Sequence, residues 1–328
     1  MPRNRIPPRK VILAKPRGFC AGVDRAIDVV NLALELYQPP IYVRKQIVHN
    51  RYVIETLSRK GAVFVDEIEE VPEGGIVIFS AHGVPPDVFH RAEQKHLNVI
   101  DATCPLVTKV HAEVKRFADE GLSIILIGHM GHDEVIGTMG ELPGQIHLVS
   151  TVDQAERVKV PDCEKVAVTT QTTLSVDDAR AIIEVLRRRF PKLVTPSSDD
   201  ICYATQNRQA AVKLIAQRAD LVLVVGSDNS SNSERLREVA EASGARAFLI
   251  DNASEIQSEW LEGADVVGIT AGASAPEKLV HDVVECFREM GVETFENIEG
   301  MAEKVAFALP SISFQEFAKS TGNSGTKH

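Results

Sequence analysis

No stretch of the sequence is long and apolar enough to attach the chain to a membrane. The longest apolar runs, SIILIG and LVLVVG, have the length of a strand, whereas a membrane-spanning helix needs about 20 apolar residues. The N-terminal residues include several arginines and prolines, but no hydrophobic segment follows them, which is not typical of a secretory signal. We therefore predict a cytoplasmic protein that does not bind membranes.

Positive charge is also scarce. The chain has 36 Lys and Arg against 46 Asp and Glu, a formal net charge of −10 and an isoelectric point near 5.5. Nucleic-acid binding requires clustered basic surface, so we expect no nucleic-acid partner, and an anionic ligand would have to be attracted by a local field. The length of 328 residues suffices for about three domains of roughly 100 residues each.

Paired cysteines and nucleotide-binding glycine motifs are absent. None of the 5 cysteines forms a CxxC pair, which argues against a disulfide framework, a zinc ribbon or a thioredoxin-like site. Neither GxxxxGK(S/T) nor GxGxxG occurs. Any phosphate site must therefore be built from other residues.

What is present is a three-fold internal repeat centred on cysteine. Cys20, Cys104 and Cys202 each follow a short segment that we expect to be extended, and each opens a helical pattern. Cys163 lies in a polar connector and Cys286 on an amphipathic helix, so we interpret both as bystanders. In each repeat, two β-rich runs that end in polar loops follow the helix at similar intervals. The corresponding loop residues are His49, His82, His132, Thr172, Ser230 and Ser274.

The alternation of strands and helices predicts an α/β fold with parallel sheets, in which ligands bind beyond the carboxyl ends of the strands. Three similar lobes in a pseudo-three-fold arrangement would bring the cysteines and polar loops to one central cavity. We predict lobes over residues 22–103, 104–198 and 199–295, with the N-terminal strand in 10–21 joining the third lobe. Residues 296–328 form a C-terminal extension, and its tail, KSTGNSGTKH, is expected to be mobile.

Three thiolates at one point can hold a zinc ion or an iron-sulfur cluster. Structural zinc favours closely spaced ligand pairs, so cysteines from three distant segments fit a cubane better. A 4Fe-4S cluster normally takes four cysteines, and a missing fourth would leave one iron open to bind substrate or water as a Lewis acid. A position before a helix is expected to lower the pKa of each thiol. Three buried structural cysteines are the alternative.

The loop GHMGHDEV contains both an imidazole and a carboxylate. Glu134 is a candidate proton donor if burial raises its pKa, with His132 beside it. Acidic residues also favour the first turn of a helix for electrostatic reasons, so a capping role for Glu134 stays open.

Hydroxyl-rich helix starts and two loop histidines suggest an anion site. Serine and asparagine are common helix caps, but a helix N-terminus also binds phosphate. Imidazoles add hydrogen bonds or charge near neutral pH. The residues of this candidate phosphate or diphosphate pocket are His49, His82, Ser230, Ser231, Asn232 and Ser274.

Nine motifs in order resemble one known family. They are PRGFCAGVDRA, VHNRYV, SAHGV, DATCPLVTKVH, GHMGHDEVIGTMG, TQTTLS, DDICYATQNRQ, VGSDNSSNS and TAGASAP. Together they resemble the 4-hydroxy-3-methylbut-2-enyl diphosphate reductases, which catalyse the last step of the non-mevalonate isoprenoid pathway. The resemblance covers about residues 11 to 290.

The resemblance implies a three-lobed α/β fold around one 4Fe-4S cluster with three cysteine ligands and one open iron. It also implies a two-electron, two-proton removal of the allylic hydroxyl of the substrate, which yields isopentenyl and dimethylallyl diphosphates. Electrons would come from a partner such as a ferredoxin or flavodoxin, because no organic cofactor is indicated.

By the same resemblance, the cluster ligands match Cys20, Cys104 and Cys202. The proton-delivering glutamate matches Glu134, with Thr172 and His132 beside it. The substrate contacts match His49, His82, His132, Thr172, Ser230, Ser231, Asn232 and Ser274.

Two other functions are compatible with the three-cysteine pattern. One is a dehydratase that resembles quinolinate synthase, which would act on a carboxylate and have no use for the serine and asparagine loop. The other is a non-catalytic iron-sulfur sensor, for which we would expect a partner surface or a DNA-binding module.

Overall fold

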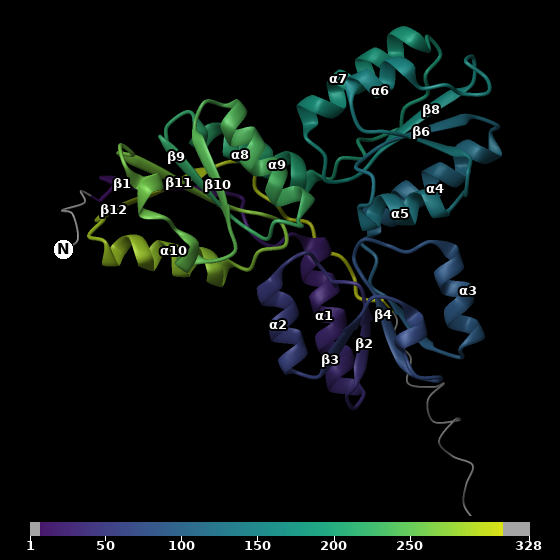
Figure 1. The fold of residues 1–328 in the computed structure, drawn as a ribbon, viewed down its shortest axis with the longest axis horizontal. Helices are drawn as coiled ribbons and strands as arrows, with labels where there is room; N and C mark the ends of the chain where they lie inside the picture. The colour runs from purple at the N-terminus through teal and green to yellow at the C-terminus, as the bar shows by residue number, and fades with distance from the viewer. Residues whose placement is uncertain (1–6, 311–328) are drawn as a thin grey trace, which may run out of the picture.

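The computed structural model describes residues 7–310 and contains three parallel β-sheets flanked by helices, which form three lobes (Figure 1). Every strand pairing within the three sheets is parallel. The predicted fold class is therefore confirmed. The predicted mobile tail lies outside the described residues. Within residues 7–310, no helix has the length and apolar character needed to cross a bilayer.

The first lobe contains a sheet of order β3-β2-β4-β5. Its strands are β2 (Ile41–Arg44), β3 (Ala62–Val65), β4 (Ile76–Phe79) and β5 (Asn98–Asp101), and its helices are α1 (Ala21–Leu36), α2 (Arg51–Arg59) and α3 (Pro86–Gln94), with a 3-10 turn at Ile68–Glu70. Helix α1 packs Val23, Val29 and Val30 against the apolar side chains of β2 and β4. This packing fixes the direction in which the start of α1 points.

The second lobe contains a sheet of order β7-β6-β8. Its strands are β6 (Ser123–Ile127), β7 (Ile146–Val149) and β8 (Val166–Thr170), and its helices are α4 (Pro105–Asp119), α5 (Asp133–Gly140), α6 (Val152–Arg157) and α7 (Val176–Arg189). Helices cover both faces of the sheet, so the side chains of β8 are buried on both sides.

The third lobe has the widest sheet, of order β10-β9-β11-β1-β12. Its strands are β1 (Lys10–Lys15), β9 (Leu221–Val225), β10 (Arg246–Ile250), β11 (Val266–Ala271) and β12 (Thr294–Glu299), and its helices are α8 (Tyr203–Ala216), α9 (Ser231–Ala242) and α10 (Glu277–Glu289), with 3-10 turns at Ala253–Glu255 and Ser258–Leu261. The sequence did not indicate β12. As an edge strand with no buried residue and two glutamates, β12 lacks the apolar pattern of an interior strand.

The lobes are joined at the cysteines. The strand before a cysteine belongs to one lobe and the helix after it to another: β1 lies in the third sheet, whereas α1 packs on the first. Likewise, β5 pairs with β4 of the first sheet, whereas α4 packs on the second. The expectation of a strand before Cys202 is wrong. Only Val194 makes an isolated parallel bridge, to Ala167, because Pro196 and the polar residues after it interrupt any ladder.

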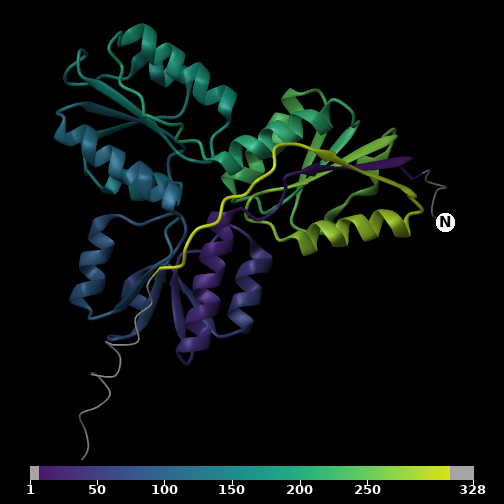
Figure 2. The same cartoon turned by 180° about the vertical axis from the view of Figure 1, so that it is seen from behind.

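A segment without regular secondary structure, residues 300–310, runs from the third lobe back to the first (Figure 2). We call it the strap. Its Glu303 pairs with Arg208 at 2.9 Å, and its Ala308 carbonyl accepts from Arg25 at 2.8 Å. Arg208 is completely buried and also donates to the carbonyls of Gly18 and Phe19. The strap therefore holds the loop that leads to the first cysteine.

Candidate active site

Every side chain that the sequence indicated for the site lines one cavity of about 100 Å³ at the meeting point of the lobes. In each sheet, two neighbouring strands end at this cavity, and the loops that follow them supply the polar residues. The strand pairs are β2 and β4, β6 and β8, and β9 and β11. The indicated residues around the cavity are Cys20, His49, His82, Cys104, His132, Glu134, Thr172, Cys202, Ser230, Ser231, Asn232 and Ser274. Their individual roles stay predictions.

Three cysteines form one wall of the cavity. Cys20, Cys104 and Cys202 are the N-cap residues of α1, α4 and α8, and all three are free thiols. Gly22 leaves room for two of the sulfurs, because a Cβ atom there would lie 2.7 Å from the Sγ of Cys104 and 3.9 Å from the Sγ of Cys20. The absence of a side chain at Gly22 thus leaves space for the two sulfur atoms and for a ligand bound to them.

The expectation that helix N-termini lower the pKa of these thiols is wrong for the protein without metal. Burial raises the pKa of Cys104 to about 12 and that of Cys202 to about 11, and backbone N–H groups offset only part of the effect. Burial also raises the pKa of Cys20, although the nearby Arg208 opposes the rise. A cationic centre stabilises buried thiols as thiolates, so a set of three such cysteines at one cavity fits a metal cluster.

The two remaining cysteines lie away from the cavity. Cys163 is exposed in the connector before β8, and Cys286 is half-buried on α10. Neither lines the cavity.

Glu134 is 2% exposed and accepts two hydrogen bonds from one residue of the facing loop. The backbone N–H of Thr172 donates to it at 2.7 Å and the Thr172 hydroxyl at 2.9 Å. Burial raises the pKa of Glu134 to about 7, because the two Thr172 bonds offset only part of the desolvation. Glu134 does lie in the first turn of α5, where the alternative interpretation placed a helix-start carboxylate. The N-cap itself is His132, and its Nδ1 accepts from the Glu134 N–H at 3.2 Å.

Three histidines gather opposite the cysteines. The rings of His49 and His82 stack with centroids 4.0 Å apart, and His132 presents its edge to them at 5.5 and 5.9 Å. Burial lowers the pKa of all three, that of His132 to about 4, and the rings disfavour one another's positive charge. In each ring Nδ1 is hydrogen-bonded within the protein, to Gln46, Ser80 or the Glu134 N–H, which leaves Nε2 for a ligand.

The serine loop, which we define as residues 230–232, is both a helix cap and part of the cavity wall. Ser230 caps α9 by accepting from the N–H of Ser233, and its hydroxyl lies 3.3 Å from that of Ser274. Asn232 accepts from the Ala273 N–H at 2.9 Å. The sequence suggested that Ser274 caps α10, but Pro276 occupies the N-cap position. The Ser274 hydroxyl instead donates to the His49 carbonyl at 2.8 Å. This bond ties the third lobe to the first.

Four residues near the cavity were not predicted from the sequence as site residues. The Asp133 carboxylate opposes the lowering of the His49 pKa. Thr205 lies with its hydroxyl 3.2 Å from the Cys202 sulfur. Gln171 and Thr173 contact Ser231 across the lobe boundary. One sequence feature could have identified two of these residues: Gln171 and Thr173 flank Thr172 in the same polar loop.

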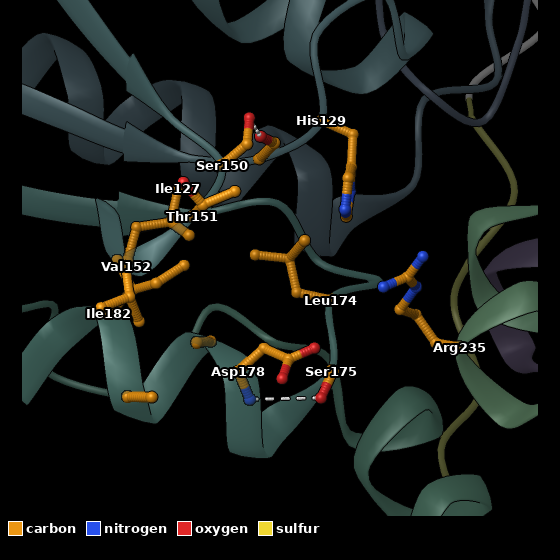
Figure 3. Close-up of a pocket in the computed structure, with 13 residues that line it drawn as sticks. Ile127, His129, Ser150, Thr151, Val152, Leu174, Ser175, Asp178, Ile182 and Arg235 are labelled. Atoms are coloured by element: carbon orange, nitrogen blue, oxygen red, sulfur yellow. Dashed lines mark hydrogen bonds between the residues drawn. The ribbon is translucent and has the colours of Figure 1, made fainter. Parts of the chain in front are cut away.

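A second, larger cavity of about 290 Å³ lies in the second lobe, and Arg235 of α9 is the lining residue that comes from the third lobe (Figure 3). The side chains of His129, Asp178 and Arg235 provide its polar surface, and Leu174 and Ile182 its apolar surface. It contains none of the cysteines, so it is not the reaction site indicated by the sequence.

The sequence profile of the family described as LytB protein matches residues 11–288 of this chain. A 4-hydroxy-3-methylbut-2-enyl diphosphate reductase of Acidothermus cellulolyticus is 60% identical over 306 residues, which cover 93% of this chain and 90% of that protein. The protein of the same name from Bordetella bronchiseptica is 59% identical over 301 residues, with 92% of each chain covered.

Solved structures agree with these matches. The E-1-hydroxy-2-methyl-but-2-enyl-4-diphosphate reductase from Plasmodium falciparum superimposes with a TM-score of 0.89 at 39% identity and covers 96% of this chain and 99% of its own. A second reductase, described as the terminal enzyme of the non-mevalonate pathway, has a TM-score of 0.61 at 33% identity, with 85% and 99% covered.

Proposed function

Because the chain belongs to the LytB family of reductases, we propose that it converts 4-hydroxy-3-methylbut-2-enyl diphosphate to isopentenyl diphosphate and dimethylallyl diphosphate. The observation that carries this proposal is the composition of one cavity. Three thiols, a buried carboxyl with a pKa raised to about 7 and a cluster of imidazoles and hydroxyls surround the same space. Of the functions weighed from the sequence, the family match favours this one.

Cys20, Cys104 and Cys202 would hold a 4Fe-4S cluster. When bound, this group supplies electrons singly and an open iron that polarises the carbon–oxygen bond of the allylic alcohol. With an electron donor such as a ferredoxin or flavodoxin, the overall change balances as one C–O bond broken, two electrons and two protons consumed, and one water released.

Glu134 would provide a proton for the departing hydroxyl. Its carboxyl keeps the proton up to about pH 7, where a free glutamate would have lost it. The Thr172 N–H and hydroxyl fix the orientation of this carboxyl and hydrogen-bond its charged form after the transfer. The surrounding lobes exclude bulk water, which keeps the proton in place until the substrate occupies the cavity.

The diphosphate would bind between the histidines and the serine loop. The Nε2 atoms of His49, His82 and His132 and the hydroxyls of the serine loop face one cavity without a lysine or arginine among its lining residues. Each of these imidazoles donates from Nε2 once it is protonated. Burial favours the neutral form of the imidazoles, whereas a bound anion favours their protonated form.

We therefore expect diphosphate binding to take up protons. Calorimetric titration with isopentenyl diphosphate at about pH 8, where the diphosphate is almost fully ionised, should give heats that differ between two buffers of unlike ionisation enthalpy. The expected uptake is about one proton or more per site, because the anion raises histidine pKa values that burial had lowered. His82→Gln should reduce the uptake, and His281→Gln, on the exposed face of α10, should not. Equal heats in both buffers would show that the histidines stay neutral.

The proposed function is tested by iron and sulfide analysis with Mössbauer spectra on protein purified without oxygen, with and without the allylic diphosphate. We expect about four irons per chain, one of them distinct and altered by the substrate. Zinc, or no metal after anaerobic reconstitution, would refute the cluster and the reductase function together.

A further inference from the structure

Gln171 connects two loops that come from different lobes. Its side chain is 1% exposed, and its Oε1 accepts from the His129 N–H at 3.0 Å in the carboxylate loop, which we define as residues 128–134. Its Nε2 donates to the hydroxyl of Thr173 at 2.8 Å and to that of Ser231 at 3.3 Å. Ser231 is the first residue of α9, in the third lobe.

The same residue precedes the partner of the proton donor. Thr172 follows Gln171 directly, and its N–H and hydroxyl hold both carboxyl oxygens of Glu134. The Gln171 backbone is fixed as well, because its N–H donates to the Ile127 carbonyl at 2.8 Å. A displacement of the serine loop therefore reaches the carboxyl of Glu134 through one buried amide and one peptide unit.

The space around Gln171 permits little movement. The residues that follow Gln171 separate two cavities: Thr172 and Thr173 line the smaller one, and Leu174 and Ser175 line the larger one shown in Figure 3. Gly128 lies so close that a Cβ atom on it would be 3.4 Å from the Gln171 Oε1. An amide held this tightly transmits a shift of one loop to the other.

We propose that Gln171 is a positioning residue that couples occupation of the diphosphate site at the serine loop to the placement of the Glu134 carboxyl. The inference rests on the proposed function, since it assumes that a diphosphate binds at this loop. Diphosphate oxygens bound at Ser230 and Ser231 draw the serine loop toward the ligand, and Gln171 carries that shift to Thr172. Proton delivery is thereby reserved for a cavity that holds a complete substrate.

The test is infrared difference spectroscopy on anaerobically purified holoprotein below pH 7, with inorganic pyrophosphate as the ligand. In the unsubstituted protein, saturating pyrophosphate should shift the C=O band of protonated Glu134, which is identified by its absence in Glu134→Gln. In Gln171→Met, which keeps the volume and loses the three hydrogen bonds, pyrophosphate should bind more weakly and the band should not shift at saturation. The turnover number with the allylic diphosphate should fall by about tenfold to a hundredfold, the order expected for a misplaced reacting group.

Gln209→Met is the matched control. Gln209 is 2% exposed, accepts from the Val176 N–H at 3.0 Å and donates to the Leu174 carbonyl at 2.8 Å, and neither of these hydrogen bonds involves the serine loop. Both substitutions remove a buried amide, and only that of Gln171 should abolish the band shift. If Gln171→Met does not fold, Ser231→Ala breaks the same connection from its other end and should also diminish the shift.

The outcomes separate the two proposals. A band shift in Gln171→Met equal to that of the unsubstituted protein, or no shift in the unsubstituted protein despite bound pyrophosphate, overturns the coupling alone. Absence of both pyrophosphate binding and reductase turnover in the unsubstituted protein overturns the proposed function.

Discussion

Glu134→Gln should remove nearly all turnover while the protein retains its fold and its iron. Glutamine has the volume of glutamate and an oxygen that can still accept from Thr172, but it has no proton to release. The loss of a general acid lowers a rate by about 10²- to 10⁴-fold. The measurement is steady-state turnover together with iron content. A near-normal rate would remove Glu134 from the mechanism.

The chain offers a matched control for this substitution. Burial also raises the pKa of Glu113 on α4 to about 7, with a further contribution from the nearby Asp200, but Glu113 does not line the cavity. Glu113→Gln should therefore leave turnover within about twofold. Such a pair distinguishes proton delivery at the site from a general effect of removing a buried acid.

The raised pKa of Glu134 determines how turnover and folding stability change with pH. Since the folded pKa of Glu134 is raised from 4.5 to about 7, turnover of the unsubstituted protein should fall as pH rises through 7. The same shift contributes stability that is complete below pH 4.5 and is lost as pH rises through 7. Relative to the unsubstituted protein, Glu134→Gln should thus gain stability toward pH 8, and thermal unfolding of both proteins across this window checks it.

Cys104→Ser should lower bound iron to a small fraction of its normal content and reduce turnover to background. Removal of this thiol leaves two ligands where three were available, and a serine hydroxyl ionises far less readily than a thiol in so buried a position. Cys163→Ser and Cys286→Ser serve as controls because neither side chain lines the cavity. Iron analysis after anaerobic purification is the measurement. Loss of iron in either control would overturn the bystander interpretation.

Local sequence patterns predicted the parts of this site that repeat. Loops at His49, His132 and Ser230 follow buried strands whose apolar runs are visible in the sequence, and the carboxyl ends of parallel strands must share one edge. The convergence of the lobes on one cavity followed from that rule and the repeated cysteines.

Features that depend on long-range contacts did not follow from local patterns. The strand β12 is stabilised by its ladder with β1, to which it is joined only in the folded chain. The thiol pKa values depend on burial by all three lobes, which outweighs the local effect of the helix start at Cys104. The role that we propose for Gln171 depends on its hydrogen bond to Ser231, a residue of another lobe.

The order of synthesis gives the position of β1 a further consequence. A ribosome releases β1 first, but the neighbours that pair with it, β11 and β12, emerge last. The first and second sheets contain only strands that lie consecutively in the chain, so each can form as its residues appear, whereas the third is complete only after β12 has been made. Cys20 follows β1 and is held by Arg208 through its preceding loop. Cys20 therefore reaches its final position beside Cys104 and Cys202 only after β11 and β12 have been made and have paired with β1.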